Sequence, residues 1–441
     1  MMKRVFSCLS GVLFLTFTFL MFMVTTVGGD NKNPSDNHQT KLIGVTESYT
    51  VGNGIAIDNL SNCCIVGSTT GNLEGQKLNG KQDAFVIKYD KNGNKRWTKL
   101  FGIAKKNTTG NSIAINSIGN CYITGDTTGN LEGQIKKGKT DAFIAKYDAN
   151  GNKQWMKLLG VAESDTKGLD IVVDGVGNCY IVGYTTGNLD GQIKTGNWDV
   201  FIAKYDANGN KQWTKLLGAF ESATYGSDIA IDAAGNCCII GSANGNLDGQ
   251  IKIGSYDAFI AKYDANGNKK WVKLLGSKYS FTYGEGIALD SAGNYYITGA
   301  IEGNLDGEEL TGFRDAFIVK YDANGNKQWT KLLGVAENTT YGSDVIINST
   351  GSCYITGWTT GNLEGQKLTG YIDGFIAKYD ENGNKQGMEK LFGAPESSTY
   401  GSDIAINSSG DFCITGWTNG NLDGQKLNGI RDAFIISKVN Q

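Results

Sequence analysis

Proline and histidine are nearly absent from this chain. Only 2 of its 441 residues are proline, and its single histidine is His38. Catalysis by a histidine base, a Ser-His-Asp triad included, therefore has no candidate after residue 40, and histidine-based metal sites fail for the same reason. The chain also lacks an excess of charge of either sign, because it has 41 basic and 44 acidic residues. This balance predicts no binding to nucleic acid.

A helical pattern is missing as well. Beyond the first 29 residues no segment keeps an apolar period of 3.6 residues, so the sequence predicts no helix there. A phosphate-binding glycine loop at the start of a helix is excluded with it. Glycine, in contrast, is abundant at 62 residues. Without a Gly-X-Y period, that content is typical of many tight turns.

One long hydrophobic run stands near the N-terminus, at residues 9–27, and follows Lys3 and Arg4. We interpret residues 1–29 as an export signal that is cut near Gly28 or Gly29. The alternative is an uncleaved membrane anchor, since the run is just long enough to span a bilayer. Both interpretations place the rest of the chain outside the cytoplasm: in the periplasm, at the cell surface or secreted. Residues 30–39 are polar and predict a linker.

The chain from residue 40 to residue 441 repeats itself seven times. An Asp-x-Phe triplet recurs every 58 or 59 residues, at Asp83, Asp141, Asp199, Asp257, Asp315, Asp373 and Asp432. Each unit contains four short runs rich in β-branched and aromatic residues, as at 228–232, 237–242, 257–264 and 269–276. Asp-Ala-Ala-Gly-Asn and Asp-Ala-Asn-Gly-Asn segments between the runs predict hairpin turns. Four strands per unit and seven units predict an all-β, seven-bladed β-propeller of antiparallel blades.

The seventh unit stops after its third strand. A copy of the fourth strand, Thr40–Gly44, stands instead at the start of the repetitive part. We expect this segment to pair into the last blade and close the ring, because an open seam would leave unpaired strand edges. The small residues of the first strand favour it as the innermost one and the Trp-bearing fourth strand as the outermost. The alternative, in which each blade begins one hairpin later in the chain, stays open at this point.

The repeated unit resembles a known family. "DAFIAKYDANGNKQWTKLLG", preceded by hairpins of the "DAAGNCYITG" type, is similar to the bacterial SBBP β-propeller repeat over residues 40–441. The resemblance implies a propeller in an exported or surface protein. It implies no catalytic activity, because that family is defined by its repeat.

Candidate binding residues lie where the copies diverge. The long connections of a propeller gather on one face, and rigid scaffolds usually bind ligands through such loops. The residues just before the Asp-x-Phe triplets vary most, and aromatic and arginine side chains often carry binding energy. We select Trp198, Tyr256, Arg314, Tyr371 and Arg431; the alternative is neutral drift in a tolerant loop.

Acidic residues offer two further hypotheses. Four carboxylates start the predicted inner strand and would rim one mouth of the channel: Asp170, Asp228, Asp344 and Asp403. Like charges that lie close together raise each other's pKa or recruit a cation, whereas the alternative is solvated turn caps. A second acidic residue recurs in every Gly-Asn-Leu-Asp/Glu-Gly loop, where it either caps its own turn or holds one calcium ion per blade. We expect no cofactor and no metal, with calcium as the alternative.

Eight cysteines follow the hydrophobic run, all at two adjacent positions of the second strand. We expect these positions in neighbouring blades to lie further apart than the ~7 Å Cα separation that a disulfide tolerates. The cysteines are therefore predicted to be buried thiols between blades.

The leading functional hypothesis is a non-catalytic, monomeric scaffold that presents its long-loop face to a macromolecule or a glycan. Membrane attachment would come only through residues 9–27, if they stay uncleaved. One rival is a hydrolase or lyase of polysaccharides with carboxylates at the channel mouth. A second rival is a calcium-stabilised structural or adhesive module. Fold alone does not decide between them.

Overall fold

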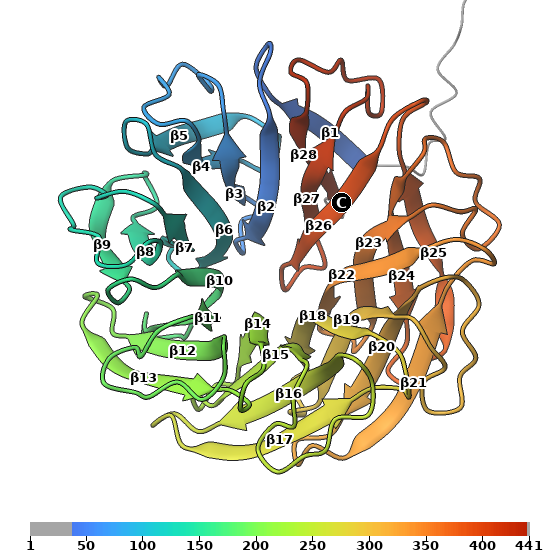
Figure 1. Ribbon diagram of the computed structural model, residues 1–441. Helices are drawn as coiled ribbons and strands as arrows, with labels where there is room; N and C mark the ends of the chain where they lie inside the picture. Colours follow the sequence, from blue (N-terminus) through green and yellow to red (C-terminus); the bar gives the residue numbers. More distant parts are fainter. Residues whose placement is uncertain (1–37, 439–441) are drawn as a thin grey trace, which may run out of the picture. The chain divides into compact units, whose positions relative to one another are not determined.

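The computed structural model describes residues 38–438, and this part of the chain consists of 28 β-strands without a helix. The strands form seven four-stranded antiparallel sheets, which stand as blades around a central axis (Figure 1). The predicted seven-bladed propeller is confirmed. Residues 38–438 contain no helix of the length and hydropathy that would cross a membrane. The expected export signal and most of the linker lie outside the described residues.

The first strand of each blade is the innermost, because it contacts the first strands of both neighbouring blades. These inner strands are β2 (Thr50–Ile57), β6 (Thr108–Ile115), β10 (Thr166–Val173), β14 (Thr224–Ile231), β18 (Thr282–Leu289), β22 (Thr340–Ile347) and β26 (Thr399–Ile406). The second strands are β3 (Cys63–Thr69), β7 (Cys121–Thr127), β11 (Cys179–Thr185), β15 (Cys237–Ala243), β19 (Tyr295–Ile301), β23 (Cys353–Thr359) and β27 (Phe412–Thr418).

The third and fourth strands complete each blade towards the rim. The third strands are β4 (Asp83–Tyr89), β8 (Asp141–Tyr147), β12 (Asp199–Tyr205), β16 (Asp257–Tyr263), β20 (Asp315–Tyr321), β24 (Asp373–Tyr379) and β28 (Asp432–Lys438). The outer strands are β5 (Lys95–Phe101), β9 (Lys153–Leu159), β13 (Lys211–Leu217), β17 (Lys269–Leu275), β21 (Lys327–Leu333), β25 (Lys385–Phe392) and β1 (His38–Ile43). The expected order, with the Trp-bearing strand outermost, is confirmed.

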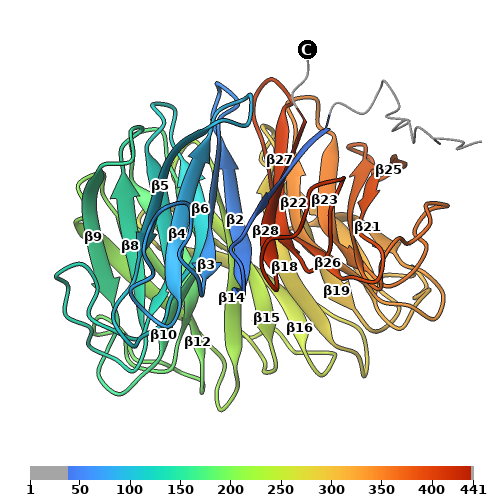
Figure 2. The same cartoon turned by 90° about the horizontal axis from the view of Figure 1, so that it is seen from above.

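Strand β1 closes the ring. It pairs antiparallel with β28, with Leu42 opposite Phe434 and Ile43 opposite Ala433, so that the last blade takes its outer strand from the other end of the chain (Figures 1 and 2). The strand starts two residues before Thr40 and ends one residue before Gly44. His38 and Gln39, expected in the linker, therefore belong to the propeller.

The hydrophobic core is divided into seven clusters, one between each pair of adjacent blades. Successive side chains of a strand point to opposite faces of its sheet. In every second strand, the first residue therefore faces the preceding blade and the second residue faces the next blade. Cys179 packs in one cluster with Tyr122 of the blade before it, whereas Tyr180 packs with Cys237 of the blade after it.

The Asp-x-Phe aspartates hold the long connections in place. Asp257 is fully buried, and its carboxylate accepts hydrogen bonds from the backbone N–H groups of Ile253 (2.7 Å) and Gly254 (2.8 Å). Gly276, which follows the outer strand, leaves room for it, because a Cβ there would lie 2.0 Å from Asp257 Oδ1. Gly44 stands in the same way against Asp432 at the ring closure. The Gly that ends each repeat is thus required by the buried aspartate.

The outer-strand tryptophans join each blade to the next. Trp97 Nε1 donates a hydrogen bond to the backbone oxygen of Ala149 (3.0 Å) in the following blade, and its ring lies against Gly151 of the same turn. Gly387 replaces this Trp in β25, opposite Lys378. The following blade has no turn at this place, because its third and fourth strands come from the two ends of the chain. The missing Trp is therefore explained by the missing turn.

Candidate functional site

Aromatic side chains follow the long-loop face from the third blade round to the closing seam. We call this set the aromatic arc. Its rings come from the starts of inner strands, the ends of second strands and the long connections around them, and the structure leaves each of them half-buried. The arc consists of Tyr184, Trp198, Tyr225, Tyr256, Phe281, Tyr283, Tyr341, Trp358, Tyr400 and Trp417.

Neighbouring rings of the arc contact one another from blade to blade. Trp198 stacks on Tyr184 with ring centres 4.8 Å apart, and it meets the edge of Tyr225 at 4.9 Å. Burial, followed by the neighbouring Tyr256 hydroxyl, raises the pKa of the Tyr225 phenol above its ordinary value. Tyr256 lies 5.8 Å from Tyr283. Such offset and edge-to-face contacts fix the ring orientations on a rigid scaffold.

The arc continues through the sixth and seventh blades. Tyr341 stacks on Trp358 with ring centres 5.4 Å apart, Trp358 meets Tyr400 at 5.3 Å, and Tyr400 stacks on Trp417 at 4.3 Å. Burial raises the pKa of the Tyr400 phenol above its ordinary value. A tyrosine hydroxyl is protonated at neutral pH and can donate a hydrogen bond.

Two arginines are inserted between these rings. Arg314 Cζ lies 5.6 Å from the ring centre of Tyr283 and 5.9 Å from that of Tyr341. Arg431 Cζ lies 3.5 Å above the ring centre of Trp417. Guanidinium groups stack favourably on aromatic faces.

The first two blades interrupt the arc. Ser68 and Asp126 occupy the place of Tyr184, since each pairs with the second residue of its inner strand as Tyr184 does. Gln82 and Thr140 stand at the position of Trp198 before the third strand. The aromatic surface is thus confined to five of the seven blades.

Four of the five binding residues predicted from the sequence belong to this surface. Trp198, Tyr256, Arg314 and Arg431 all lie in or against the arc. Tyr371 does not; its side chain is 67% exposed, and Ile372 occupies the position equivalent to theirs. Variation between the copies did not reveal the rings of the inner and second strands. The inner-strand rings had a separate signal, a Thr-Tyr-Gly triplet in the last four units, at 224–226, 282–284, 340–342 and 399–401.

The four channel aspartates line a cavity of about 310 Å³ at the axis. Each carboxylate accepts a backbone N–H of the next blade: Asp170 from Ile229, Asp228 from Ile287, Asp344 from Ile404 and Asp403 from Ile55. The aspartates therefore link adjacent inner strands, the last of them across the closing seam.

Burial raises the pKa values of three of these carboxyl groups. The pKa of Asp344 rises to about 6, with burial as the first cause. The pKa values of Asp228 and Asp403 rise well above the ordinary range, because of burial and the neighbouring carboxyl groups of Asp170 and Asp344. Glu285 faces the same cavity, and burial raises its pKa to about 7 although the Tyr341 hydroxyl donates a hydrogen bond to it.

The recurrent loop acids form contacts that the sequence analysis did not consider. In six blades the Asp or Glu pairs with the Lys that begins the outer strand, as Glu74 does with Lys95. In the seventh, Asp423 accepts hydrogen bonds from Thr40 (2.5 Å) and Lys390 (2.9 Å). Among residues 38–438 no group of three or more His, Cys, Asp or Glu side chains is arranged to hold a metal ion.

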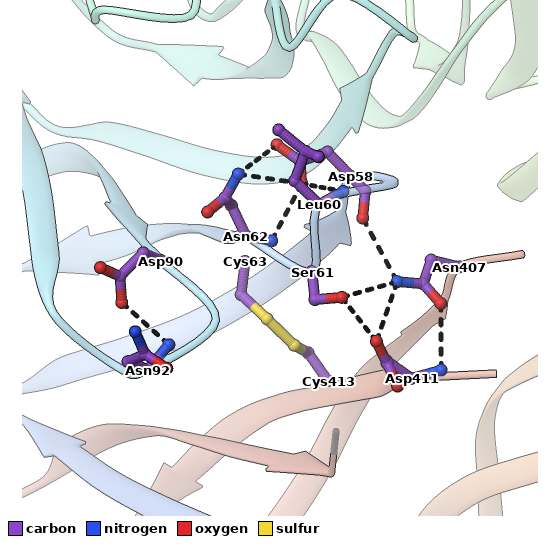
Figure 3. The surroundings of a disulfide bond; sticks show 10 residues. All are labelled: Asp58, Leu60, Ser61, Asn62, Cys63, Asp90, Asn92, Asn407, Asp411 and Cys413. Carbon is purple, nitrogen blue, oxygen red and sulfur yellow. Dashed lines mark hydrogen bonds between the residues drawn. A yellow bond between two sulfur atoms is a disulfide. The ribbon is translucent and has the colours of Figure 1, made fainter. Parts of the chain in front are cut away.

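The prediction of free thiols was wrong for one pair. Cys63 and Cys413 form a disulfide between the first and last blades, with their Cα atoms 6.7 Å apart (Figure 3). The expected separation failed because the two adjacent positions face opposite neighbours, so the second residue of one blade meets the first residue of the next. Six other cysteines are buried free thiols: Cys64, Cys121, Cys179, Cys237, Cys238 and Cys353.

Further polar contacts reinforce this seam. Ser61 replaces the turn Gly of other blades although its φ is +62°, and its hydroxyl donates to Asp411 (2.5 Å) in the last blade. Asn407 donates to Ser61 Oγ (3.1 Å) (Figure 3). Ring closure thus combines strand pairing, a disulfide and matched turn side chains.

This geometry defines a closed β-propeller with an aromatic face. Comparison identifies the family: the chain belongs to the SBBP beta-propeller repeat family, whose model matches residues 40–74, 96–132, 154–190, 212–248, 270–306 and 328–364.

Longer proteins share this sequence pattern. The chain is 25% identical to the regulatory protein FlaEY of Caulobacter vibrioides over 410 residues, which cover 82% of this chain and 42% of that protein. It is also 25% identical to an uncharacterised WD repeat-containing protein, L264, of Acanthamoeba polyphaga mimivirus, over 74% of this chain and 30% of the other. The chain therefore spans less than half the length of these relatives.

Some solved structures resemble the chain at low sequence identity. The β-propeller domain of the Trilobed protease from Pyrococcus furiosus is 10% identical, with a TM-score of 0.48, 89% of this chain covered and 94% of that chain. An inactive virginiamycin B lyase from Staphylococcus aureus is 10% identical, with a TM-score of 0.49 and coverages of 91% and 100%.

Proposed function

We propose that this propeller is an exported, non-catalytic binding module whose aromatic arc binds a glycan. The observation that carries the proposal is the arc itself, a series of half-buried rings over five blades, with Arg314 between the rings of the fifth and sixth blades. Sugar rings carry apolar C–H faces that stack on aromatic rings, and their hydroxyls pair with phenol groups. A polymer of sugars repeats these faces along its length, as the arc repeats its rings.

Two further features support the module's location and its lack of catalysis. The Cys63–Cys413 disulfide is typical of oxidising compartments outside the cytoplasm. In this proposal the channel carboxylates serve the blade seams, where they accept backbone N–H groups. We therefore expect no cleavage of the bound polymer.

Affinity electrophoresis through gels that contain a neutral polysaccharide (dextran or a β-glucan) or polygalacturonate tests the proposal. Replacing Trp198 and Tyr225 by Ala removes two stacking rings, each worth roughly 0.5–1.5 kcal/mol. Together the rings are worth about 1–3 kcal/mol, so we expect the double variant to bind roughly five- to 150-fold more weakly. Ile118→Ala is the control. This apolar side chain is 72% exposed and lies in the short turn between β6 and β7, away from the arc.

Two outcomes would overturn the proposal: retardation by none of the polysaccharides, or equal retardation of wild type and the double variant. Capture of a polypeptide through the same rings, without glycan binding, would assign the arc to a protein partner instead. Reducing-end assays on the bound polymer check the absence of cleavage.

A further inference from the structure

We infer that Arg431 forms an anion subsite at the end of the aromatic arc, so that the preferred glycan carries carboxylate or sulfate groups. This inference rests on the proposed function and adds the chemical class of the ligand. Its starting point is a difference between two equivalent arginines. Arg314 and Arg431 both stand immediately before a third strand and lie over rings of the arc.

Arg314 is neutralised within its own blade. Glu302, the first residue after strand β19, accepts a hydrogen bond from Arg314 Nε (3.1 Å) and forms an ion pair with its Nη2. The guanidinium therefore has a carboxylate partner already. An added anion would compete with Glu302.

Arg431 has no such partner. The first residue after strand β27 is Asn419, whose amide oxygen accepts the backbone N–H of Ser398 (2.7 Å). Within residues 38–438, no hydrogen-bond acceptor is found for Arg431 Nε, and no ion pair to Arg431 is formed. The charge sits on the Trp417 face at 3.5 Å, with Tyr49 at 5.8 Å.

This combination matches an acidic sugar. A planar guanidinium binds a carboxylate or a sulfate through two parallel N–H groups. Tyr400 stacks on Trp417 next to the guanidinium, so the sugar that carries the anion would meet the edges of these rings. A neutral sugar would use the rings and leave the arginine unused.

The test compares binding to polygalacturonate, dextran sulfate and neutral dextran by affinity electrophoresis at two salt concentrations. Arg431→Met keeps the side-chain stem over Trp417 and removes the charge. We expect at least tenfold weaker binding to one or both anionic polymers and less than threefold change for the neutral one. Arg96→Met is the matched control, because it removes a guanidinium that pairs with Asp90 at a short turn, away from the arc; it should change acidic binding less than threefold.

A second variant supplies the missing partner. Asn419→Glu reproduces the residue that stands beside Arg314, and we expect it to remove the preference for anionic polymers without loss of neutral binding. The polymer that loses affinity distinguishes carboxylate from sulfate recognition. Equal binding of all three polymers by wild type, or an unchanged preference in both variants, would overturn the subsite and leave the binding module intact. No binding to any polymer would overturn both.

A second inference rests on the cysteines alone. We propose that Cys64 and Cys121 form another disulfide, between the first and second blades. Their sulfur atoms lie 3.2 Å apart and both side chains are fully buried. Cys64 is the second residue of strand β3 and Cys121 the first residue of β7, the same combination that forms the bridge between Cys413 and Cys63. Closing the distance to a disulfide of ~2.05 Å needs a movement of about 1.2 Å.

Bond formation requires an oxidant. The oxidant is another disulfide, carried by a small molecule or by an enzyme. Two thiols lose two protons and two electrons to one such disulfide, which leaves as two thiols. Both cysteines are shielded in the closed ring, and burial raises the pKa of the Cys64 thiol. The exchange therefore takes place before the seam between these blades closes.

The bridge is counted by mass. Protein refolded with oxidised glutathione is denatured without reductant, alkylated with iodoacetamide and weighed. With the Cys63–Cys413 bridge alone, the six free cysteines of residues 38–438 would be alkylated; we expect four. Cys63 and Cys64 share one tryptic peptide, so both bridges together join three peptides into one species. Cys121→Ala should restore one alkylation, at Cys64, whereas Cys179→Ala should remove one. Six alkylations in the wild type would overturn the inference.

Discussion

Loss of the Cys63–Cys413 bridge is the sharpest perturbation of ring closure. The disulfide joins residues 350 positions apart. In the chain-entropy account, a loop of that length stabilises the folded state by about 6 kcal/mol through its effect on the unfolded chain. The entropy of unfolding is about 2.1 cal/mol/K per residue, or ~0.8 kcal/mol/K for a propeller of this size. We therefore expect Cys413→Ala to lower the melting midpoint by about 7 °C.

Thermal unfolding followed by circular dichroism measures this shift. Cys179→Ala is the matched control, because it removes a buried thiol that faces Tyr122 without bridging; its midpoint should fall by only 1–2 °C, roughly the cost of a small cavity. Under reducing conditions, which open every disulfide, the wild type and Cys413→Ala should melt close together. The reasoning is refuted if Cys413→Ala and Cys179→Ala shift the midpoint equally while thiol titration shows the wild type to be bridged.

Three further predictions concern closure and the channel. Deleting residues 38–43 should lower the midpoint more in the reduced than in the oxidised protein, because the disulfide holds the seam when β1 is gone; equal losses would contradict this. The melting midpoint should rise as pH falls from 8 to 5. Burial raises the folded-state pKa of the Asp344 carboxyl to about 6, so this group binds its proton more tightly in the folded state than in the unfolded state. The stability that comes from this proton is lost as pH rises through 6. Asp344→Asn should flatten this profile, and an unchanged slope would exclude the residue as its source. Gln39→Trp should fill the cavity of about 210 Å³ beside Gly93 and raise the midpoint by about 2 °C through added apolar burial; a fall would show that the seam has no room.

The blade count and ring closure were predictable, since a period of 58 or 59 residues and one displaced strand determine them. The strand order was favoured only by the small residues of the first strand and the tryptophans of the fourth. The disulfide was predictable in principle but was missed. The second strand places adjacent residues on opposite faces, so the relevant comparison is between the second position of one unit and the first position of the next. Cys413 with Cys63 and Cys64 with Cys121 are the two Cys–Cys matches by that rule. Comparison of like positions concealed both.

The candidate site could be predicted only in part. Divergence before the third strand identified Trp198, Tyr256, Arg314 and Arg431, because contact positions vary more than scaffold positions. It could not reveal that an arginine in one blade is neutralised while its equivalent is not. That distinction depends on the contact between Arg314 and Glu302, which are 12 residues apart in the chain. Beside Arg431 the equivalent residue is Asn419, which carries no charge.

The closing seam also positions the end of the aromatic arc. Arg431 lies in the last blade and Tyr49 in the connection from β1 to β2, and the two residues form a parallel bridge in which Thr50 N–H donates to Arg431 O (2.9 Å). Opening the seam would therefore displace Arg431 from Tyr49 while Tyr184, Trp198 and Tyr225 stay in place on the opposite blades. In a protein that lacks both β1 and the Cys63–Cys413 bridge, affinity for anionic polymers should fall before affinity for neutral ones. If the affinities for anionic and neutral polymers fall by the same factor in the reduced, truncated protein, the position of Arg431 does not depend on ring closure.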